Sequence, residues 1–327
     1  MELAVYFSDL DRLMRIDDAL HVIDPNEIPP HLQSILFGDD ISTKEYYGNL
    51  VGLTWMELVT GGEREFSRLY FGQEFCEHLI PSSDDLEQAF FFARQMGWDF
   101  TYVTGYLTGV GLEKVRRNLA RLAEIGHENE VVVNDWGVMR VLRQDFPALK
   151  PVLGRLLCKQ KRMIRFNRRE TPPPVYMTGI DAPEADIRRN QVQAYRDISL
   201  ANPVYRDFLL DLGVVSADLD IVPLGLQQPE AGWGLPIGFY YPWGYAACGR
   251  NCPTAGVVDP RRAHVVLDGP CPRPCRQFNR TRELTHYPEI SLQRGNTLFV
   301  FHGEYASPYF NVTIPYDRLI FEPYIPI

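Results

Sequence analysis

Four of the six cysteines lie within a stretch of 28 residues, in two pairs that share the same internal spacing. The first pair is CGRNC at 248–252 and the second is CPRPC at 271–275. Thiolates are soft donors that bind zinc or the irons of an iron–sulfur cluster, and two short-spaced pairs can converge on one centre. The spacing therefore predicts a metal centre. Its ligands are expected mainly among Cys248, Cys252, Cys271 and Cys275.

The neighbours of these cysteines favour a cluster over zinc. Proline follows Cys252 and Cys271 directly, and it stiffens the chain at the ligand. Three arginines lie within or beside the pairs and can offset the thiolate charge: Arg250, Arg273 and Arg276. Zinc knuckles more often have two intervening residues than three, so zinc stays the alternative. Chance clustering of buried free cysteines is the remaining interpretation.

Cys76 and Cys158 lie outside these pairs, and each taken alone is expected to be structural. Cys76 follows a predicted strand at 68–72, which in a barrel would place it at the mouth where sites are built. Cys158 lies in the basic stretch 155–169, which carries seven Lys or Arg residues and no acid. We expect this stretch to be a solvated loop, with an anion or nucleic-acid contact as the alternative.

Strand-like and helix-like segments alternate along the chain, which predicts an α/β fold of the (β/α) barrel type, incomplete or decorated. One domain is expected over 1–327, with an irregular insertion at about 20–65 and a cysteine-rich metal-binding segment at 240–280. Periodicity does not separate a closed barrel from an open sheet. Strands are predicted at 2–7, 68–72, 100–104, 130–134, 151–156, 219–222, 235–241, 264–267, 297–301 and 318–321. Helices are predicted after Ser8-Asp9, from Ser82, and at 112–125, 137–145 and 204–212.

Composition narrows the class of protein. Apolar residues make up 45% and charged residues 23% of the chain, as in soluble globular proteins. The net charge of −9 argues against nucleic-acid binding except through the basic stretch. The first residues do not resemble a secretory signal, and no apolar run suits a membrane span. We therefore expect a cytoplasmic protein, no membrane, and reduced cysteines.

Several segments, in this order, resemble the collagenase-like peptidase family. They are YFGQEF at 70–75, SSDDLEQAFFFARQMGWDFTYVT at 82–104, EVVVNDWGVMRVLRQDFP at 130–147, RNCPTAG at 250–256 and the CPRPC pair. The resemblance covers roughly two-thirds of the chain, in barrel order. It implies the neighbourhood of the UbiU- and UbiV-like iron–sulfur proteins, which act in the oxygen-independent hydroxylation of ubiquinone, in a family that also includes proteins for the hydroxylation of RNA bases. The pattern of the peptidase-type members is not evident.

The resemblance implies a 4Fe-4S cluster and a particular ligand set. One ligand follows the YxG strand end and three lie in the later cysteine region. The matching positions here are Cys76, Cys252, Cys271 and Cys275. Cys248 has no counterpart in this pattern, whereas local spacing prefers it over Cys76. Both therefore stay candidates, and four of the five cysteines are expected to bind the metal.

Polar residues at predicted strand ends are the candidates for substrate contact or proton transfer. Asn134 and Asp135 follow one strand, and Asp135 is equally suited to cap the next helix. Glu74 follows another strand, with a surface carboxylate as the alternative. Arg155 follows a third and could clamp a substrate carboxylate, or simply belong to the exposed basic stretch.

Aromatic and histidine residues complete the candidates. Tyr240, Tyr241 and Trp243 precede the first cysteine pair, where they either shield a cluster from water or serve as core aromatics. His264 and His302 lie on predicted strands and are expected to be structural.

Three functions stay open. The leading one is an iron–sulfur protein in an oxygen-independent redox or hydroxylation reaction on a small aromatic molecule or a nucleobase. The second is a peptidase-like hydrolase with zinc on the cysteines, although no Ser-His-Asp set and no HExxH helix is present. The third is a cluster-bearing, non-catalytic subunit that binds a heteromeric protein partner.

Overall fold

The computed structural model describes residues 1–20, 65–126, 128–162, 184–222, 225–229, 232–266, 269–277, 280–281, 291–301 and 316–327. The predicted insertion at 20–65 lies outside these residues except at its two ends. None of the described helices is both long enough and apolar enough to cross a membrane.

Eight parallel strands form a closed barrel, and their order around it follows the chain. This settles the choice between a closed barrel and an open sheet in favour of the barrel. The last strand, β12, closes it by pairing with both β7 and β1. The barrel strands are β1 (Glu2–Phe7), β2 (Arg68–Gly72), β3 (Asp99–Val103), β4 (Glu130–Val133), β5 (Lys150–Leu153), β6 (Ser216–Asp220), β7 (Ile237–Tyr241) and β12 (Arg318–Phe321).

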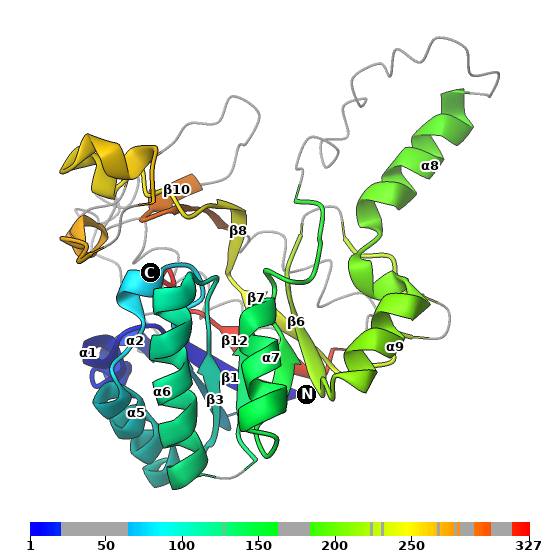
Figure 1. Cartoon of the computed structure of the whole chain (residues 1–327). Coiled ribbons are helices and arrows are strands. Elements are labelled where there is room, and N and C mark those ends of the chain that lie inside the picture. Colours follow the sequence, from blue (N-terminus) through cyan, green and yellow to red (C-terminus); the bar gives the residue numbers. More distant parts are fainter. Residues whose placement is uncertain are drawn as a thin grey trace, which may run out of the picture.

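Helices cover the outside of the barrel, except for α8, which extends away from it, as Figure 1 shows. Their starts follow sequence signals: Ser82 forms a capping box with Asp85, and the Asp135 side chain caps the helix that follows β4. The helices are α1 (Leu10–Leu13), α2 (Ile16–Leu20), α5 (Ser83–Gln95), α6 (Gly109–Ile125), α7 (Trp136–Asp145), α8 (Glu184–Arg196) and α9 (Pro203–Asp211). The short 3₁₀ helices η2 (Glu77–Leu79) and η4 (Ser199–Ala201) lie in connections.

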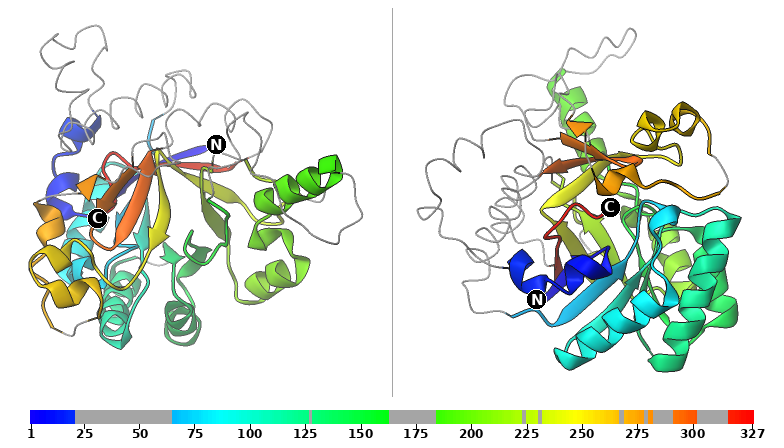
Figure 2. Two further views of the ribbon diagram at one scale, coloured as in Figure 1. Left: turned by 90° about the horizontal axis from the view of Figure 1, so that it is seen from above. Right: turned by 90° about the vertical axis from the view of Figure 1, so that its left-hand side faces the viewer.

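A second, antiparallel sheet is inserted between β7 and β12 and lies over one end of the barrel (Figure 2). Its strand order is β8, β11, β10, β9. The bounds are β8 (Trp243–Cys248), β9 (Arg280–Thr281), β10 (Ser291–Arg294) and β11 (Thr297–Phe301). Three 3₁₀ helices accompany it: η5 (Ala255–Val257), η6 (Pro260–Ala263) and η7 (Pro274–Arg276). The strand predicted at 264–267 is wrong for its described residues, because His264 caps the end of η6 and Val265 and Val266 follow in a bend and coil.

Successive side chains along the barrel strands point alternately to the helices and to the barrel interior, which gives two separate hydrophobic cores. On β1, Leu3, Val5 and Phe7 face the helices, whereas Ala4 and Tyr6 face the barrel interior. Both faces are buried, which explains the continuous apolar runs in the sequence. Side chains fill the interior, so the barrel is a packed core and its site must lie at an end. The interior set is Ala4, Tyr6, Tyr70, Val103, Val132, Val152, Tyr240 and Ile320.

Gly72 ends β2 in a conformation that only glycine adopts easily. Its φ is +140°, and a Cβ built there would lie 2.1 Å from the carbonyl oxygen of Val103. We expect Gly72→Ala to lower the free energy of unfolding by at least ~1–3 kcal/mol, measured by urea denaturation. Gly97 also has a positive φ, of +71°, but faces open space, so Gly97→Ala isolates the backbone strain. An equal loss of unfolding free energy in both variants would contradict the explanation by a steric clash at Gly72.

Candidate functional site

The carboxyl end of β2 leads directly into the candidate metal centre. After Gly72 the chain runs through Gln73, Glu74 and Phe75 to Cys76, whose backbone carbonyl accepts a hydrogen bond from Leu79 in η2 at 3.0 Å. The mouth of a barrel lies at the carboxyl ends of its strands, and functional side chains gather there. The predicted position of Cys76 at a strand end is therefore found in the structure.

Four of the six cysteines line one small cavity of about 40 Å³. Cys76 reaches it from the β2 end, and the other three come from the insertion that carries the second sheet. These four, which we call the thiol cluster, are Cys76, Cys252, Cys271 and Cys275. Cys248 is not among the lining residues. Its sulfur accepts a hydrogen bond from the Thr297 hydroxyl, with a distance of 3.3 Å between Sγ and Oγ1.

Backbone N–H groups point at two of the late thiols. Ala255 donates its N–H to Cys252 Sγ at 3.3 Å, and Arg273 donates its N–H to Cys271 Sγ at 3.5 Å. Arg273 reaches this geometry with a left-handed φ of 54°, which is uncommon for a residue other than glycine. Such N–H groups stabilise a thiolate, the form of cysteine that binds metals.

The pKa values also show which thiols are neighbours. The pKa of Cys76 is raised to about 12, mainly by burial and to a smaller extent by the neighbouring Cys275, Cys252 and Cys271. Burial raises the pKa of Cys248 to about 11, but the charge that adds to this effect is that of Glu74 and not of another cysteine. The structure thus brings together the set that the family resemblance implied and leaves Cys248 beside it.

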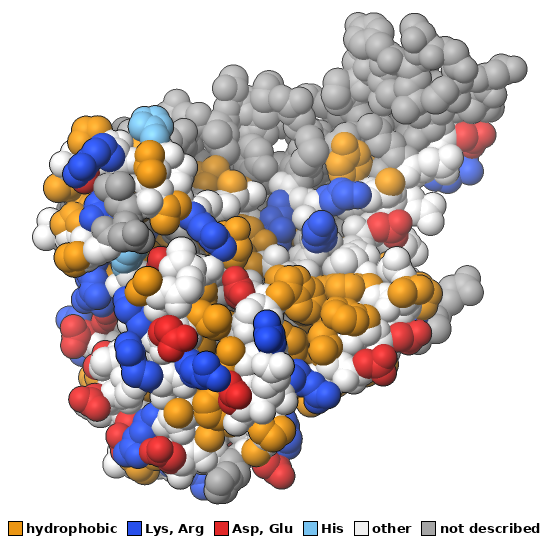
Figure 3. All heavy atoms as spheres, in the orientation of Figure 1, with side chains coloured by type: hydrophobic (Ala, Val, Ile, Leu, Met, Phe, Trp, Pro, Cys, Tyr) orange, Lys and Arg blue, Asp and Glu red, His pale blue; other side chains and the backbone are white. Residues whose placement is uncertain are grey.

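Arginines surround the thiol cluster. Arg250, Arg262 and Arg273 line the cavity, and Glu77 is the carboxylate among the lining residues. Arg250 donates to the carbonyl of Leu107 at 3.0 Å, and Arg262 donates to the carbonyl of Pro270 at 2.9 Å. Figure 3 shows Lys and Arg side chains on the lobe at the upper left, which carries this part of the chain. The surroundings are therefore suited to several negative charges.

The thiols of the cluster do not converge on a single point. Within the described part of the chain, no three His, Cys, Asp or Glu side chains are grouped closely enough to hold one metal ion. A cavity of 10–15 Å³ already holds one water molecule, so 40 Å³ exceeds the room that a single ion needs.

Arg155 is fully buried at the barrel mouth, and all five of its N–H groups are bonded to the protein. Nε and Nη2 donate to Glu74 at 3.0 and 2.6 Å. Nη1 donates to Asp220 at 2.9 Å and to the Trp243 carbonyl at 3.1 Å, and Nη2 also donates to Glu322 at 2.5 Å. No donor is left for a substrate carboxylate, so both the predicted clamp and the exposed-loop alternative are wrong.

The other strand-end candidates belong to the same buried network. Glu74 is buried, which overturns the surface alternative, and Asn134 donates to it at 3.1 Å. Asn134 also donates to the carbonyl of Thr104 and accepts from the Leu156 N–H, so its polar atoms are occupied. Asp135 caps α7 by accepting from the Gly137 N–H at 2.7 Å. These contacts position the loops at the barrel mouth.

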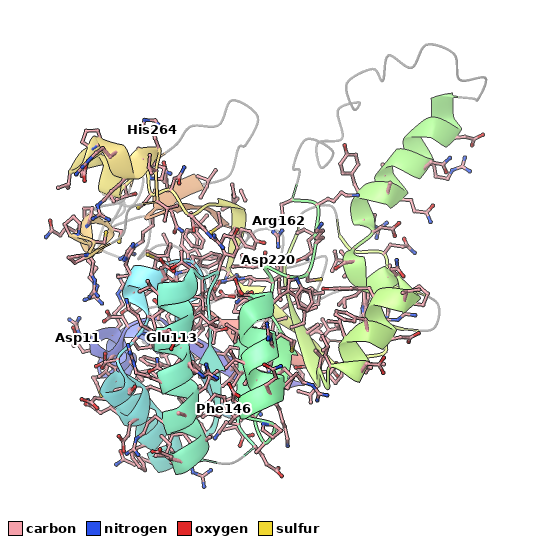
Figure 4. All side chains as sticks on the ribbon, in the orientation of Figure 1. Asp11, Glu113, Phe146, Arg162, Asp220 and His264 are labelled. Carbon is pink, nitrogen blue, oxygen red and sulfur yellow. The ribbon has the colours of Figure 1, made fainter. Side chains whose placement is uncertain are left out.

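The remaining candidates separate into core and surface residues. Tyr240 lies in the barrel interior, and its ring centroid is 3.7 Å from the guanidinium carbon Cζ of Arg155. Tyr241 lies in the core outside the barrel. Trp243 packs in the core that also contains Cys275. Cys158 is buried, as expected of a structural cysteine. His264 is exposed at the outer edge of the lobe (Figure 4), and His302 lies outside the described residues.

Three network residues were not predicted: Asp220, Glu322 and Arg162. Asp220 ends β6 and Glu322 directly follows β12, so the strand-end rule that selected Glu74 could have found both. Arg162 lies in the basic stretch, and only the folded chain shows its 2.7 Å ion pair with Asp220 (Figure 4). The described part of the basic stretch, up to residue 162, is thus partly internal.

Glu322 makes stability depend on pH. Burial raises its pKa from 4.5 to about 8, although Arg155 lowers it. A carboxyl with a raised pKa stabilises the fold fully below its unfolded pKa, and this contribution is lost as the pH rises through about 8. We expect Glu322→Gln to flatten the fall in unfolding free energy between about pH 5 and about pH 8.5, measured in urea. The control Glu124→Gln, at an exposed position, should show the same change of unfolding free energy with pH as the parent. The prediction is contradicted if Glu322→Gln also shows the parent's change.

Comparison with known proteins gives no assignment, because no family model, no curated protein and no solved structure matches this chain. The resemblance to the collagenase-like peptidase family therefore stays a prediction.

Proposed function

We propose that this chain is an iron–sulfur protein that holds a 4Fe-4S cluster on the thiol cluster and takes part in an oxygen-independent redox reaction. The observation that carries the proposal is that four thiols from two distant parts of the sequence line one cavity. Buried free cysteines that pack only as small hydrophobes have no reason to gather in this way.

The donor set suits a cluster. Four thiolates are the usual ligands of a 4Fe-4S cluster, and the net charge of such a site is negative. Arg250, Arg262 and Arg273 supply compensating positive charge, and two backbone N–H groups point at the sulfurs. Hydrogen bonds to the sulfurs and burial are the protein's means of tuning the potential of a bound cluster.

Zinc is the weaker alternative. Four thiolates would leave zinc no open position, which is typical of a structural and not a catalytic site. Zinc–sulfur bonds of about 2.3 Å would also require the four sulfurs to converge on one point. The spread of the thiols around the cavity favours a larger group.

The surroundings suggest what this chain's residues do. Cys76 and Cys275 pack in an apolar core that includes Phe75 and Trp243. A bound cluster would exchange single electrons. Because Arg155 and its partners fill the barrel axis, a substrate must approach beside the axis. The reaction class remains that of hydroxylating a small aromatic molecule or a nucleobase, in this chain alone or as a subunit with a protein partner.

Anaerobic purification followed by iron, sulfide and zinc analysis tests the proposal. We expect about four iron and four sulfide per chain, with broad visible absorbance that bleaches on reduction. Zinc without sulfide would refute the proposed redox function and indicate a structural metal site.

A further inference from the structure

A larger cavity adjoins the thiol cluster, and we name it the polar cavity. Its volume is about 620 Å³, within the range of pockets that hold small-molecule ligands. The start of α1, the loop before α5, the first turns of α6 and η7 form its walls. Arg273 and Leu79 line both the polar cavity and the thiol cavity, so a molecule bound in one lies next to the other.

Four cations line the polar cavity: Lys114, Arg117, Arg273 and Arg276. Arg276 is paired with Asp9 at 2.8 Å. Among the residues that the structure describes, none forms an ion pair or side-chain hydrogen bond with Lys114, Arg117 or Arg273. Lys114 and Arg117 lie three residues apart on α6 and so share a face of the helix. Three cations that have no side-chain partner within the described part of the chain therefore line one cavity.

The carboxylates of this region are mostly engaged with helix starts. Asp9 caps α1, and Asp85 accepts from the Ser82 N–H at 3.1 Å in the capping box of α5. Glu77, in an adjoining cavity that shares Lys114 and Arg273, accepts from the Thr108 N–H at 2.7 Å at the start of α6. Asp11 also lines the polar cavity and is exposed (Figure 4), so three carboxylates, Asp9, Asp11 and Asp85, line it together with the four cations. Because helix N-termini carry positive partial charge, the engaged acids leave the cations in surplus.

We propose that the polar cavity binds the phosphate group of a small phosphate monoester through Lys114, Arg117 and Arg273. A phosphate monoester carries nearly two negative charges near neutral pH and offers three acceptor oxygens, which matches several cations from two elements. A single carboxylate needs only one arginine. Binding does not depend on the metal centre, whereas a role as the substrate's anchor rests on the proposed function.

Arg116 provides a matched control for Arg117. It is the neighbouring residue on α6, but it points elsewhere and pairs with Asp145 of α7. Arg117→Gln and Arg116→Gln change the net charge of the protein equally. Only the first removes a charge from the polar cavity.

The test is calorimetric titration of the anaerobically purified full chain with glycerol 3-phosphate, succinate and a mixed-sequence oligonucleotide. We expect saturable binding of the monoester, weakened about tenfold or more in Arg117→Gln and unchanged in Arg116→Gln. Equal weakening in both variants, succinate binding as tight as that of the monoester, or binding of the oligonucleotide alone would overturn the assignment. Iron analysis of the same samples separates the two proposals: a cluster without monoester binding refutes this site, and monoester binding without iron refutes the proposed function.

Discussion

Cys76→Ser is expected to lose most of the iron and sulfide that the parent protein retains, whereas Cys248→Ser keeps them. Cys76 lines the thiol cavity and Cys248 does not. A serine hydroxyl is a poor ligand for iron at neutral pH, so three thiolates would have to hold a group that needs four. Iron and sulfide analysis of anaerobically purified protein, with the visible absorbance spectrum, measures the effect.

Cys248→Ser is the matched control because Cys248 is also partly buried and its side chain accepts a hydrogen bond from Thr297. A serine there can keep that hydrogen bond. If Cys248→Ser loses the iron and Cys76→Ser retains it, the four ligands are the late cysteines that sequence spacing preferred. If neither variant changes the metal content, the cysteines do not bind a metal in the proposed way.

Arg155→Met is expected to destabilise the fold severely. Arg155 is the common partner of the buried Glu74, Asp220 and Glu322. Because burial raises the pKa of Glu322 to about 8, the pairs that count near neutral pH are those with Glu74 and Asp220. Removing one partner of a buried ion pair costs about 3–5 kcal/mol, because the remaining charge is left without compensation. We expect a loss of at least that order in the free energy of unfolding, measured by urea denaturation near neutral pH.

Three comparisons separate the charge effect from a loss of packing. The variant should regain stability as the pH falls, since the orphaned carboxyls then become neutral. Arg155→Lys should also be destabilised, because an ammonium group cannot reproduce the planar set of five donors. Arg116→Met, which breaks a partly exposed pair, should unfold close to the parent. A pH-independent loss in Arg155→Met would contradict the electrostatic explanation.

The barrel could be predicted from the sequence because its signals are local. Strands β1, β2 and β12 lie at the predicted residues, since short continuous apolar runs that follow a polar first residue suit a parallel strand buried on both faces. The capping box at Ser82 and the Asp135 cap likewise depend on residues within one helical turn. The strand β8 was not predicted.

Only the tertiary structure decided how these elements combine around the candidate site. Barrel closure depends on β12 pairing with β1, and its register links residues more than 300 positions apart, a separation that periodicity cannot read. The same long-range closure brings Glu322 to Arg155, so that Arg155 binds carboxylates of the protein itself and not that of a substrate. It also places Cys76 beside the late cysteines and leaves Cys248 facing Thr297. Residue types and spacing determined which chemistry this chain can carry, and long-range packing decided which of those side chains meet.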